Sequence, residues 1–216
     1  TAGGGAPPSR RPGAAFTPPC SSYIVTVVQV YDDVLAVATG GNEIQLYSWS
    51  RRGAIGQLVG HTNSVPGLAT ICDYCPEVPG VTLFSGSVDR TLRAWDVATR
   101  RELWQMRAPA ACGEIAAIPP RRAGAGWRLA SGHRSTDHNV RVWDLTTRTL
   151  QLVLPGHSST VRGVAVLPGD LLASSSDDRT VRLWNVSTGG VAAGDVAVDE
   201  ADAEAAAAAA TAGAKR

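Results

Sequence analysis

The sequence predicts an all-β chain of about four repeats, each forming a small antiparallel sheet of four strands. Residues 85–100 and 174–189 agree at nine of sixteen positions in the same register. Aromatic residues recur at intervals of 48, 48 and 41 residues, at Tyr47, Trp95, Trp143 and Trp184. Short runs of alternating apolar and polar residues lie between Gly, Pro, Asp and Ser, a pattern typical of strands joined by tight turns.

The last repeat shows the strand pattern most clearly. Its runs at 161–167, 171–176 and 180–186 predict three successive strands, and a weaker run at 190–196 predicts a fourth. The same spacing predicts third strands at 43–49, 91–97 and 140–145, and fourth strands at 54–59, 102–107 and 149–154.

Length and composition fit one globular unit with tails. The chain has 216 residues, of which 44% are apolar, and this is enough for a single core. The most apolar stretch, residues 23–31, is much shorter than the roughly 20 residues that cross a bilayer, so no membrane span is expected. A net charge of +1 is too small to predict nucleic-acid binding by charge alone.

The two ends differ from the middle in composition. Residues 1–20 are rich in Pro, Gly and Ala and lack acids, which predicts a disordered tail, with an organellar transit peptide as the alternative. Residues 199–216 are rich in Ala and predict a short helix that acts as a linker. The repeats occupy residues 21–198, divided at about 21–60, 61–108, 109–156 and 157–198.

Two further markers keep the same period. Gly60-His61 and Gly156-His157 are 96 residues apart, and Asp89 and Asp178 each precede the aligned Trp by six residues. With the following Trp-Asp or Trp-Asn, these residues resemble the WD40-repeat β-propeller family over residues 21–198. The resemblance implies a partial β-propeller of about four four-stranded antiparallel blades. Because the family usually has more blades and the chain begins with Thr, we expect a piece of a longer propeller or a chain that associates to cover its ends.

The resemblance also implies one structural hydrogen-bonded cluster in each complete repeat. It joins a His before the first strand, a Ser on the second, an Asp in the next turn and the Trp on the third. The implied members are His61, Ser85 or Ser87, Asp89 and Trp95 in repeat two, and His157, Ser174 or Ser176, Asp178 and Trp184 in repeat four. Repeat three has Pro109 in place of the His. Repeat one has Cys20, Gly41 and Tyr47 in place of the His, the Asp and the Trp, so we expect the first repeat to be the loosest.

Catalytic, metal and cofactor sites are not expected. A Ser, His and Asp together suggest a catalytic triad, but they recur as structural residues and no G-x-S-x-G sequence is present. Cys72 and Cys75 have half the spacing of a zinc site, and no second C-x-x-C follows. Because the four cysteines form no disulfide framework, the sequence predicts a reducing compartment, the cytoplasm or the nucleus.

Arginines offer a candidate partner surface. Arg52, Arg100 and Arg148 each follow the aligned aromatic residue by five positions, so the family topology places them in turns on one rim. Longer loops at 72–80 and 119–128 lie on the same rim, and Trp127 in the second loop is a candidate interface anchor. The alternatives are that these turns are merely polar and that Trp127 packs back on its blade.

The predicted function is a non-enzymatic scaffold for other proteins, with no small-molecule substrate. One alternative is the substrate-recognition subunit of a ubiquitin ligase, although Ala98, Thr146 and Ser187 stand where some family members have an adaptor-docking Arg. Another is association with RNA or chromatin through the arginines. The resemblance specifies the fold far more closely than the partner.

Overall fold

A computed structural model describes residues 23–71, 80, 83–121, 125–134, 137–191 and 196–197, with side chains up to residue 189. Within these residues all extended regular structure is β-strand, which confirms the all-β prediction. The two tails and the Cys72-x-x-Cys75 pair lie outside the described residues.

The strands form four antiparallel sheets, which we call blades 1 to 4 in chain order. Blade 1 contains β1 (Ile24–Tyr31), β2 (Val34–Thr39), β3 (Ile44–Ser48) and β4 (Gly53–Leu58). Blade 2 contains β5 (Gly67–Ala69), β6 (Leu83–Gly86), β7 (Thr91–Asp96) and β8 (Arg101–Arg107). Blade 3 contains β9 (Cys112–Ile118), β10 (Arg128–His133), β11 (Val140–Asp144) and β12 (Thr149–Leu154). Blade 4 contains β13 (Val161–Leu167), β14 (Leu171–Ser176), β15 (Thr180–Asn185), β16 (Gly190–Val191) and β17 (Val196–Ala197).

The first four strands of each blade form a simple meander in which consecutive strands pair antiparallel. The predicted third and fourth strands agree with the observed ones to within two residues, except in blade 4. There the described part of the fourth strand predicted at 190–196 lies in two short strands, β16 and β17, which pair with different parts of β15, and residues 192–195 lie outside the described residues.

A register shift recurs between the third and fourth strands of the first three blades. It lies between Leu46 and Tyr47, between Ala94 and Trp95, and between Val142 and Trp143. Such a shift accommodates an extra residue and increases local twist. The aligned aromatic residue therefore directly follows the register shift in each of these blades.

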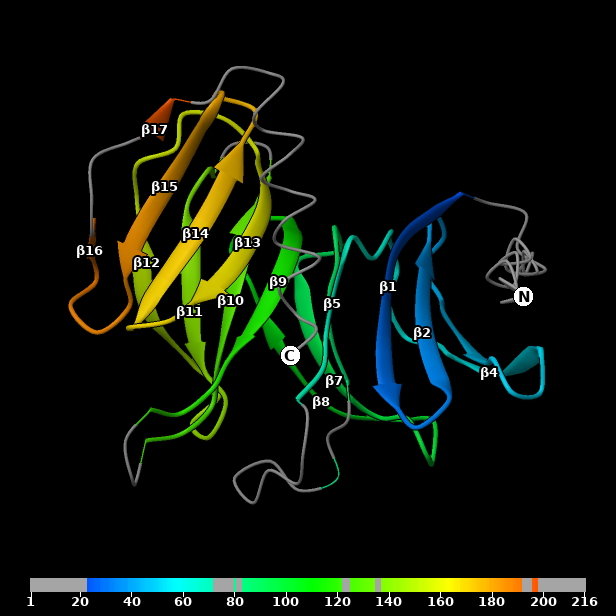
Figure 1. The fold of residues 1–216 in the computed structure, drawn as a ribbon. Coiled ribbons are helices and arrows are strands. Elements are labelled where there is room, and N and C mark those ends of the chain that lie inside the picture. The colour runs from blue at the N-terminus through cyan, green and yellow to red at the C-terminus, as the bar shows by residue number, and fades with distance from the viewer. Residues whose placement is uncertain are drawn as a thin grey trace, which may run out of the picture.

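The four blades follow one another in an arc, from β1–β4 on the right of Figure 1 to β13–β17 on the left. The first strands β1, β5, β9 and β13 lie against one another in this order and form the inner side of the arc. Three apolar clusters fill the spaces between blades 1 and 2, 2 and 3, and 3 and 4. The core is therefore made between blades, and the predicted partial β-propeller is confirmed.

The inner strands approach each other closely at Gly67 on β5. A Cβ atom added there would lie 2.5 Å from the carbonyl oxygen of Gly113 and 2.9 Å from the backbone nitrogen of Ile115. Both atoms belong to the β9 backbone, which cannot move aside without shifting blade 3. Glycine is therefore required at this point of contact between blades 2 and 3.

Candidate functional site

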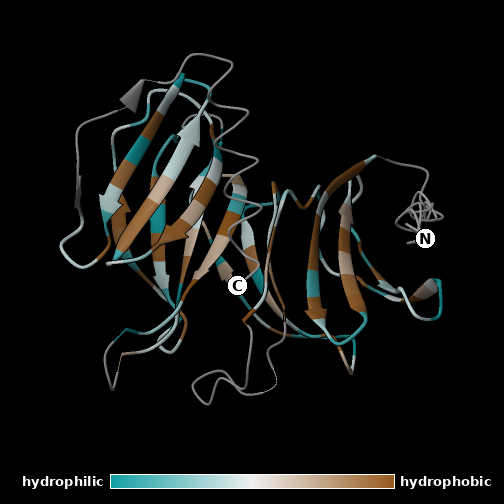
Figure 2. Cartoon of the chain, viewed as in Figure 1, coloured by the Kyte–Doolittle hydropathy of each residue, from teal (hydrophilic) through white to brown (hydrophobic). Residues whose placement is uncertain are grey.

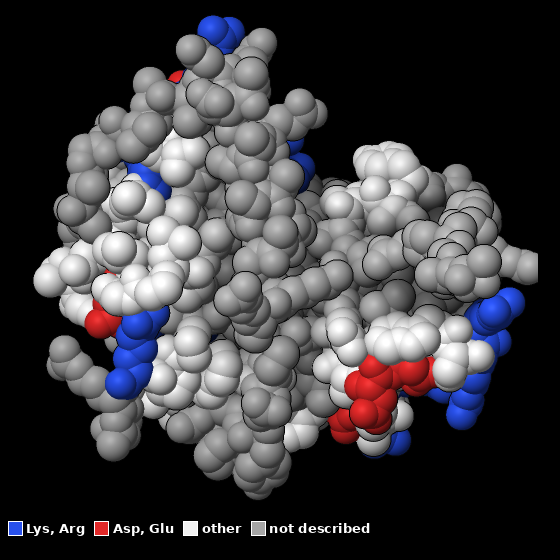
Figure 3. Space-filling model, viewed as in Figure 1, with Lys and Arg blue, Asp and Glu red and all other residues white. Residues whose placement is uncertain are grey.

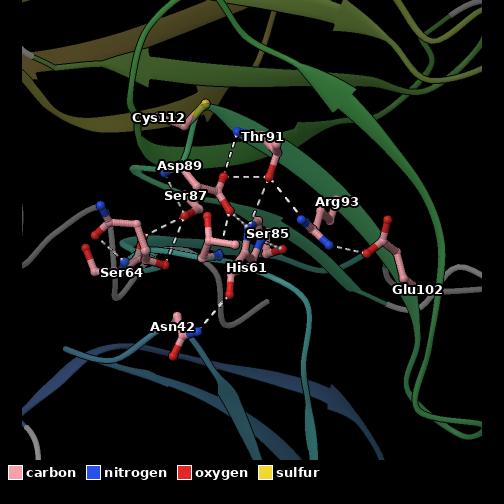
Figure 4. A network of polar contacts seen from close by, with 12 residues as sticks. Asn42, His61, Ser64, Ser85, Ser87, Asp89, Thr91, Arg93, Glu102 and Cys112 are labelled. Atoms are coloured by element: carbon pink, nitrogen blue, oxygen red, sulfur yellow. Dashed lines mark hydrogen bonds and ion pairs between the residues drawn. The ribbon is translucent and has the colours of Figure 1, made fainter.

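The polar cluster predicted for blade 2 forms as a continuous chain of hydrogen bonds (Figure 4). The indole N–H of Trp95 donates to Ser85 Oγ at 2.8 Å. Ser85 Oγ lies 2.7 Å from His61 Nε2, and His61 Nδ1 lies 2.8 Å from Asp89 Oδ2. With the Nδ1–H donating to the carboxylate, Nε2 is free to accept the serine hydroxyl, so every member is satisfied.

The structure separates the roles of the two candidate serines. Ser85 carries the Trp95 and His61 contacts. Ser87 donates instead to the carbonyl oxygens of Asn63 and Ser64, at 3.1 and 2.9 Å. Ser87 Oγ also accepts the backbone N–H of Asp89 at 3.0 Å, so it fixes the turn that presents the carboxylate.

Blade 4 repeats this arrangement almost atom for atom. Trp184 Nε1 donates to Ser174 Oγ at 2.8 Å, and Ser174 Oγ lies 2.7 Å from His157 Nε2. His157 Nδ1 lies 2.7 Å from Asp178 Oδ2. Ser176 takes the second role, because its hydroxyl donates to the Ser159 carbonyl and accepts from Asp178 N.

The glycine before each histidine is explained by the tryptophan ring. A Cβ atom added at Gly60 would lie 3.0 Å from Trp95 Cη2 and 2.6 Å from Arg93 Nη1. The same atom at Gly156 would lie 3.0 Å from Trp184 Cη2 and 2.5 Å from an Arg182 nitrogen. Glycine therefore precedes each histidine because the backbone at this position packs closely against the indole ring.

Blade 3 rebuilds the cluster with a histidine that the sequence analysis did not place there. His133 Nε2 lies 3.0 Å from Ser131 Oγ, which also accepts the Trp143 indole N–H at 2.8 Å. His133 Nδ1 lies 3.3 Å from the Ala110 carbonyl oxygen. His133 occupies the position of Ser87, and the sequence signal was Ser131-Gly-His133 in place of Ser85-Gly-Ser87.

Asp137 does not join this rebuilt cluster by a hydrogen bond. Its carboxylate accepts from Arg141 Nη2 at 2.5 Å and from the backbone N–H of Asn139. In blade 3 the carboxylate at the position of Asp89 and Asp178 therefore pairs with an arginine and makes no hydrogen bond to a histidine.

Blade 1 has no equivalent histidine in the described residues. Tyr47 is buried at the aromatic position, and Asp33 accepts hydrogen bonds from the hydroxyls of Ser48 and Ser50 at the other end of the blade. The Asn42 side chain donates to the His61 carbonyl oxygen at 2.8 Å and so connects blade 1 to the cluster of blade 2 (Figure 4). Whether blade 1 is the loosest blade stays a prediction.

The carboxylate of Asp89 stays ionised inside the cluster. Burial by itself raises the pKa of Asp89, but hydrogen bonds from Thr91, the Thr62 N–H and His61 outweigh burial and bring the pKa to about 2. Burial lowers the pKa of His61, and the Asp89 hydrogen bond only partly offsets this. At neutral pH the pair is therefore a neutral imidazole that donates to a carboxylate.

The Ser–His–Asp contacts resemble those of a hydrolase but cannot be reached by a substrate. Ser85 is 0% exposed, and its oxygen already accepts the Trp95 N–H. A nucleophile needs an open approach to its oxygen and a nearby site for the developing oxyanion. The geometry assigns these residues to holding the blade together.

The predicted arginines occupy equivalent turns between the third and fourth strands. Arg52, Arg100 and Arg148 are exposed and have left-handed backbone conformations, with φ values of 52°, 59° and 58°. Glycine adopts this conformation at lower cost, and Gly189 does so in the fourth blade with a φ of 74°. We call the side of the molecule that carries these turns the arginine rim.

Two of these arginines also contact the preceding blade. The Arg148 guanidinium carbon lies 5.1 Å from the ring centroid of Trp104 on β8. The Arg100 side chain lies beside Gly56 on β4, where an added Cβ would be 2.6 Å from its Nε. Arg52 stands in blade 1, which no described blade precedes. Figure 3 shows basic side chains at the outer edge of blade 1, next to acidic ones at the β1–β2 turn.

Trp127, the proposed anchor, is half-buried against the apolar cluster between blades 2 and 3. Its carbonyl oxygen accepts the backbone N–H of Leu145, which fixes the end of the loop before β10. A cavity of about 320 Å³ lies nearby on the same rim, lined by residues that include Arg121, Arg128, Asp144 and Ser187. The rim is therefore hollowed between blades 3 and 4.

A metal centre is not supported by the part of the chain that the structure describes. In that part, no group of three or more His, Cys, Asp or Glu side chains is arranged to hold an ion. The same residues contain no helix long and apolar enough to cross a membrane.

Burial of His133 makes stability depend on pH. Burial, aided by the nearby Arg141 charge, lowers the pKa of His133 to about 4. In the unfolded chain the pKa of this histidine is about 6.5, so below that pH the unfolded chain binds a proton that the folded chain does not. The free energy of unfolding is therefore highest above pH 6.5 and falls as the pH drops toward 4. From pH 6.5 to 5 the loss is roughly 1.5 kcal/mol.

The change His133→Gln should remove this contribution. Urea unfolding at several pH values should show that the stability difference between wild type and the variant shrinks as the pH falls from 6.5 to 5. Glu114, whose pKa burial raises to about 7, acts with the opposite sign but equally in both proteins. A difference that does not change with pH would contradict a neutral, buried His133.

Comparison with known proteins finds the same repeat. The sequence model described as "WD domain, G-beta repeat" matches residues 53–96 and 148–185. Each matched region begins at the outer strand of one blade and ends in the third strand of the next, so one sequence repeat spans two blades.

Several curated proteins are similar to the chain. The "WD repeat-containing protein pop2" of Schizosaccharomyces pombe is 36% identical over 197 residues, covering 78% of the chain and 27% of pop2. The "Nuclear distribution protein PAC1" of Ajellomyces capsulatus is 32% identical over 139 residues, covering 55% of the chain and 30% of that protein. "Protein FIZZY-RELATED 2" of Arabidopsis thaliana is 26% identical over 159 residues, covering 69% of the chain and 30% of that protein. The chain therefore spans less than a third of the length of each of these relatives.

Proposed function

Because the chain belongs to the WD40-repeat β-propeller family, we propose that it is a non-enzymatic platform that binds other proteins, with the arginine rim as its contact surface. The side chains of His61 and Ser85 are buried inside blade 2 and are not available to a partner. The groups left for recognition are the exposed turns and loops, which is where a rigid scaffold usually carries its binding residues. We expect it to act in the cytoplasm or the nucleus.

The observation that carries this proposal is the conformation of the rim arginines. Arg52, Arg100 and Arg148 keep a left-handed backbone that costs a non-glycine residue about 1 kcal/mol, while their side chains stay exposed. The guanidinium groups of Arg100 and Arg148 lie against the preceding blade, at Gly56 and at Trp104, while each residue as a whole stays exposed. A row of guanidinium groups favours a partner surface rich in carboxylates.

An acidic probe tests the rim directly. Binding of a fluorescent polyglutamate peptide should weaken roughly tenfold in an R100E/R148E variant, equivalent to about 1.4 kcal/mol. Binding to wild type should also weaken between 0.1 and 1 M salt, as the Debye length falls from about 10 to about 3 Å. Fluorescence anisotropy measures both effects.

The chain offers a matched control on its opposite rim. Arg90 and Arg179 are also exposed arginines with left-handed backbones, with φ values of 69° and 67°, but they lie in the turns between second and third strands. An R90E/R179E variant should bind the peptide like wild type. Equal losses in both variants, or no binding at low salt, would exclude the arginine rim as a specific surface. Tighter binding of a single-stranded RNA of the same charge would favour the alternative RNA-associated function.

A further inference from the structure

The cavity between blades 3 and 4 lies where a long loop meets a short turn. The loop from β9 to β10 covers residues 119–127, whereas residues 168–170 suffice to join β13 to β14. Left-handed backbone conformations at Gly169 and Asp170, with φ values of 81° and 59°, make the second connection a tight turn. The cavity of about 320 Å³ lies between the two on the arginine rim, and Figure 2 shows mainly hydrophilic residues at this end of blade 3.

Two arginines of blade 3 reach blade 4 at this cavity. Arg121 Nη2 donates to the Leu167 carbonyl oxygen at 2.8 Å, and its Nε lies 3.4 Å from Asp170 Oδ1. Arg128 Nη1 donates to the Val186 carbonyl oxygen at 2.9 Å, and its Nη2 lies 4.0 Å from the same Asp170 oxygen. A guanidinium carries five N–H donors, so these contacts fix both groups in place and leave several donors of each for a ligand.

Asp144 supplies an acceptor beside these donors. Arg128 and Asp144 are directly paired across β10 and β11, so their side chains share one face of the sheet. They form no ion pair with each other, because the Arg128 guanidinium is held by blade 4. Asp144 Oδ1 accepts the backbone N–H groups of Thr146 and Thr147, both at 2.8 Å. Its second oxygen, Oδ2, accepts from no group in the described part of the chain.

The charges that line the cavity balance. Its described charged residues are two arginines and two aspartates, and its other polar side chains, Gln151 and Ser187, are neutral. A charged side chain that entered would lose its hydration without meeting a net opposite charge. A neutral group that both donates and accepts hydrogen bonds meets the arginines and Asp144 together. The carboxamide of Asn or Gln is such a group, with two N–H donors and one carbonyl oxygen.

We propose that this cavity binds the carboxamide of one Gln or Asn side chain from a partner protein. The carboxamide oxygen accepts from Arg121 and Arg128, and its N–H donates to Asp144 Oδ2. The volume, about 320 Å³, is at the small end of ligand pockets and suits one side chain. The inference rests on the proposed function, because the arginine rim brings the partner to the cavity. It adds that the acidic segment of the partner is interrupted by one neutral amide residue.

Three polyglutamate peptides that differ only at the central residue test the proposal. The central residue is Gln, Met or Glu, and fluorescence anisotropy measures binding to the full chain. The Gln peptide should bind roughly tenfold more tightly than the Met peptide, which has the same net charge and a similar size but makes no comparable hydrogen bonds. The Gln peptide should also bind more tightly than the Glu peptide, although the Glu peptide carries one more negative charge.

The variant Asp144→Asn should reverse the order of the Gln and Glu peptides. Asparagine can hold this turn, because Asn185 at the same place in blade 4 accepts two backbone N–H groups of its own turn. The Asn side chain then presents an N–H donor to the cavity in place of the carboxylate oxygen, which favours a ligand that only accepts. The variant Asp96→Asn is the matched control at the same position of blade 2, and it should keep the wild-type order.

The outcomes separate the cavity from the arginine rim. Equal binding of the Gln and Met peptides, a wild-type preference for Glu, or an order that Asp96→Asn changes as much as Asp144→Asn would overturn the inference and leave the rim intact. If no peptide binds, the rim fails as a partner surface, and nuclear magnetic resonance tests the cavity alone. Millimolar N-acetylglutamine methylamide should then shift the backbone amide signal of Ser187 more than N-acetylmethionine methylamide does, and equal shifts would overturn the inference.

Discussion

Replacing Trp95 by alanine is expected to lower the free energy of unfolding by about 3 to 5 kcal/mol, the usual cost of removing a buried aromatic side chain. Trp95 is 1% exposed and lies in the cluster that joins blades 1 and 2. Its removal leaves a cavity between the blades and takes the N–H donor from Ser85. Thermal unfolding should show a fall in melting temperature of roughly 10 °C.

Trp49 provides the control for this prediction. It stands two residues after the aligned aromatic position, and its side chain is 49% exposed. Trp49→Ala should change stability by less than about 1 kcal/mol, because little apolar surface returns to water. Similar losses for Trp49→Ala and Trp95→Ala would contradict the assignment of Trp95 as the residue that joins two blades.

Asp178→Ala is expected to cost about 2 to 4 kcal/mol, because it leaves several buried donors without an acceptor. The Asp178 carboxylate accepts from His157 Nδ1, from the backbone N–H of Ser158, and from both the N–H and the hydroxyl of Thr180. Burial opposes its ionisation, and these hydrogen bonds nevertheless hold the pKa of Asp178 well below its usual value. Urea unfolding at pH 7 measures the loss.

The neighbouring residue is the matched control. Asp177 lies in the same turn but is exposed, and it pairs with the exposed Arg162 through two contacts of 2.7 Å. Exposed ion pairs contribute about 1 kcal/mol or less, so Asp177→Ala should be nearly neutral. An equal effect of the two substitutions would show that the cluster does not depend on its buried carboxylate.

The sequence located the strands well because the relevant signal is local. Alternation of apolar and polar residues and the turn residues that separate the runs are both properties of neighbours in the chain. The predicted runs at 161–167 and 171–176 coincide with β13 and β14. Of the weakest run, at 190–196, the described residues 190–191 and 196 lie in β16 and β17.

The different roles of the two serines could not be predicted from the local sequence pattern. Ser85 lies on β6 and Ser87 directly follows the strand. Alternation along a strand puts residues two apart on the same face, so this pattern does not separate the two serines. Only the position of the His61 ring, which comes from a loop 24 residues earlier, selects Ser85 for the cluster. His133 went unassigned for a related reason, because it reaches Ser131 from within its own strand.

By itself, the sequence determined that the chain is a set of repeated four-stranded sheets, where their strands lie, and which tryptophan, histidine and aspartate residues repeat. Only the tertiary structure decided which serine completes each cluster and how His133 replaces a missing histidine. The reason is physical: strand pattern depends on residues adjacent in the chain, whereas burial and hydrogen bonding depend on atoms brought together from different blades.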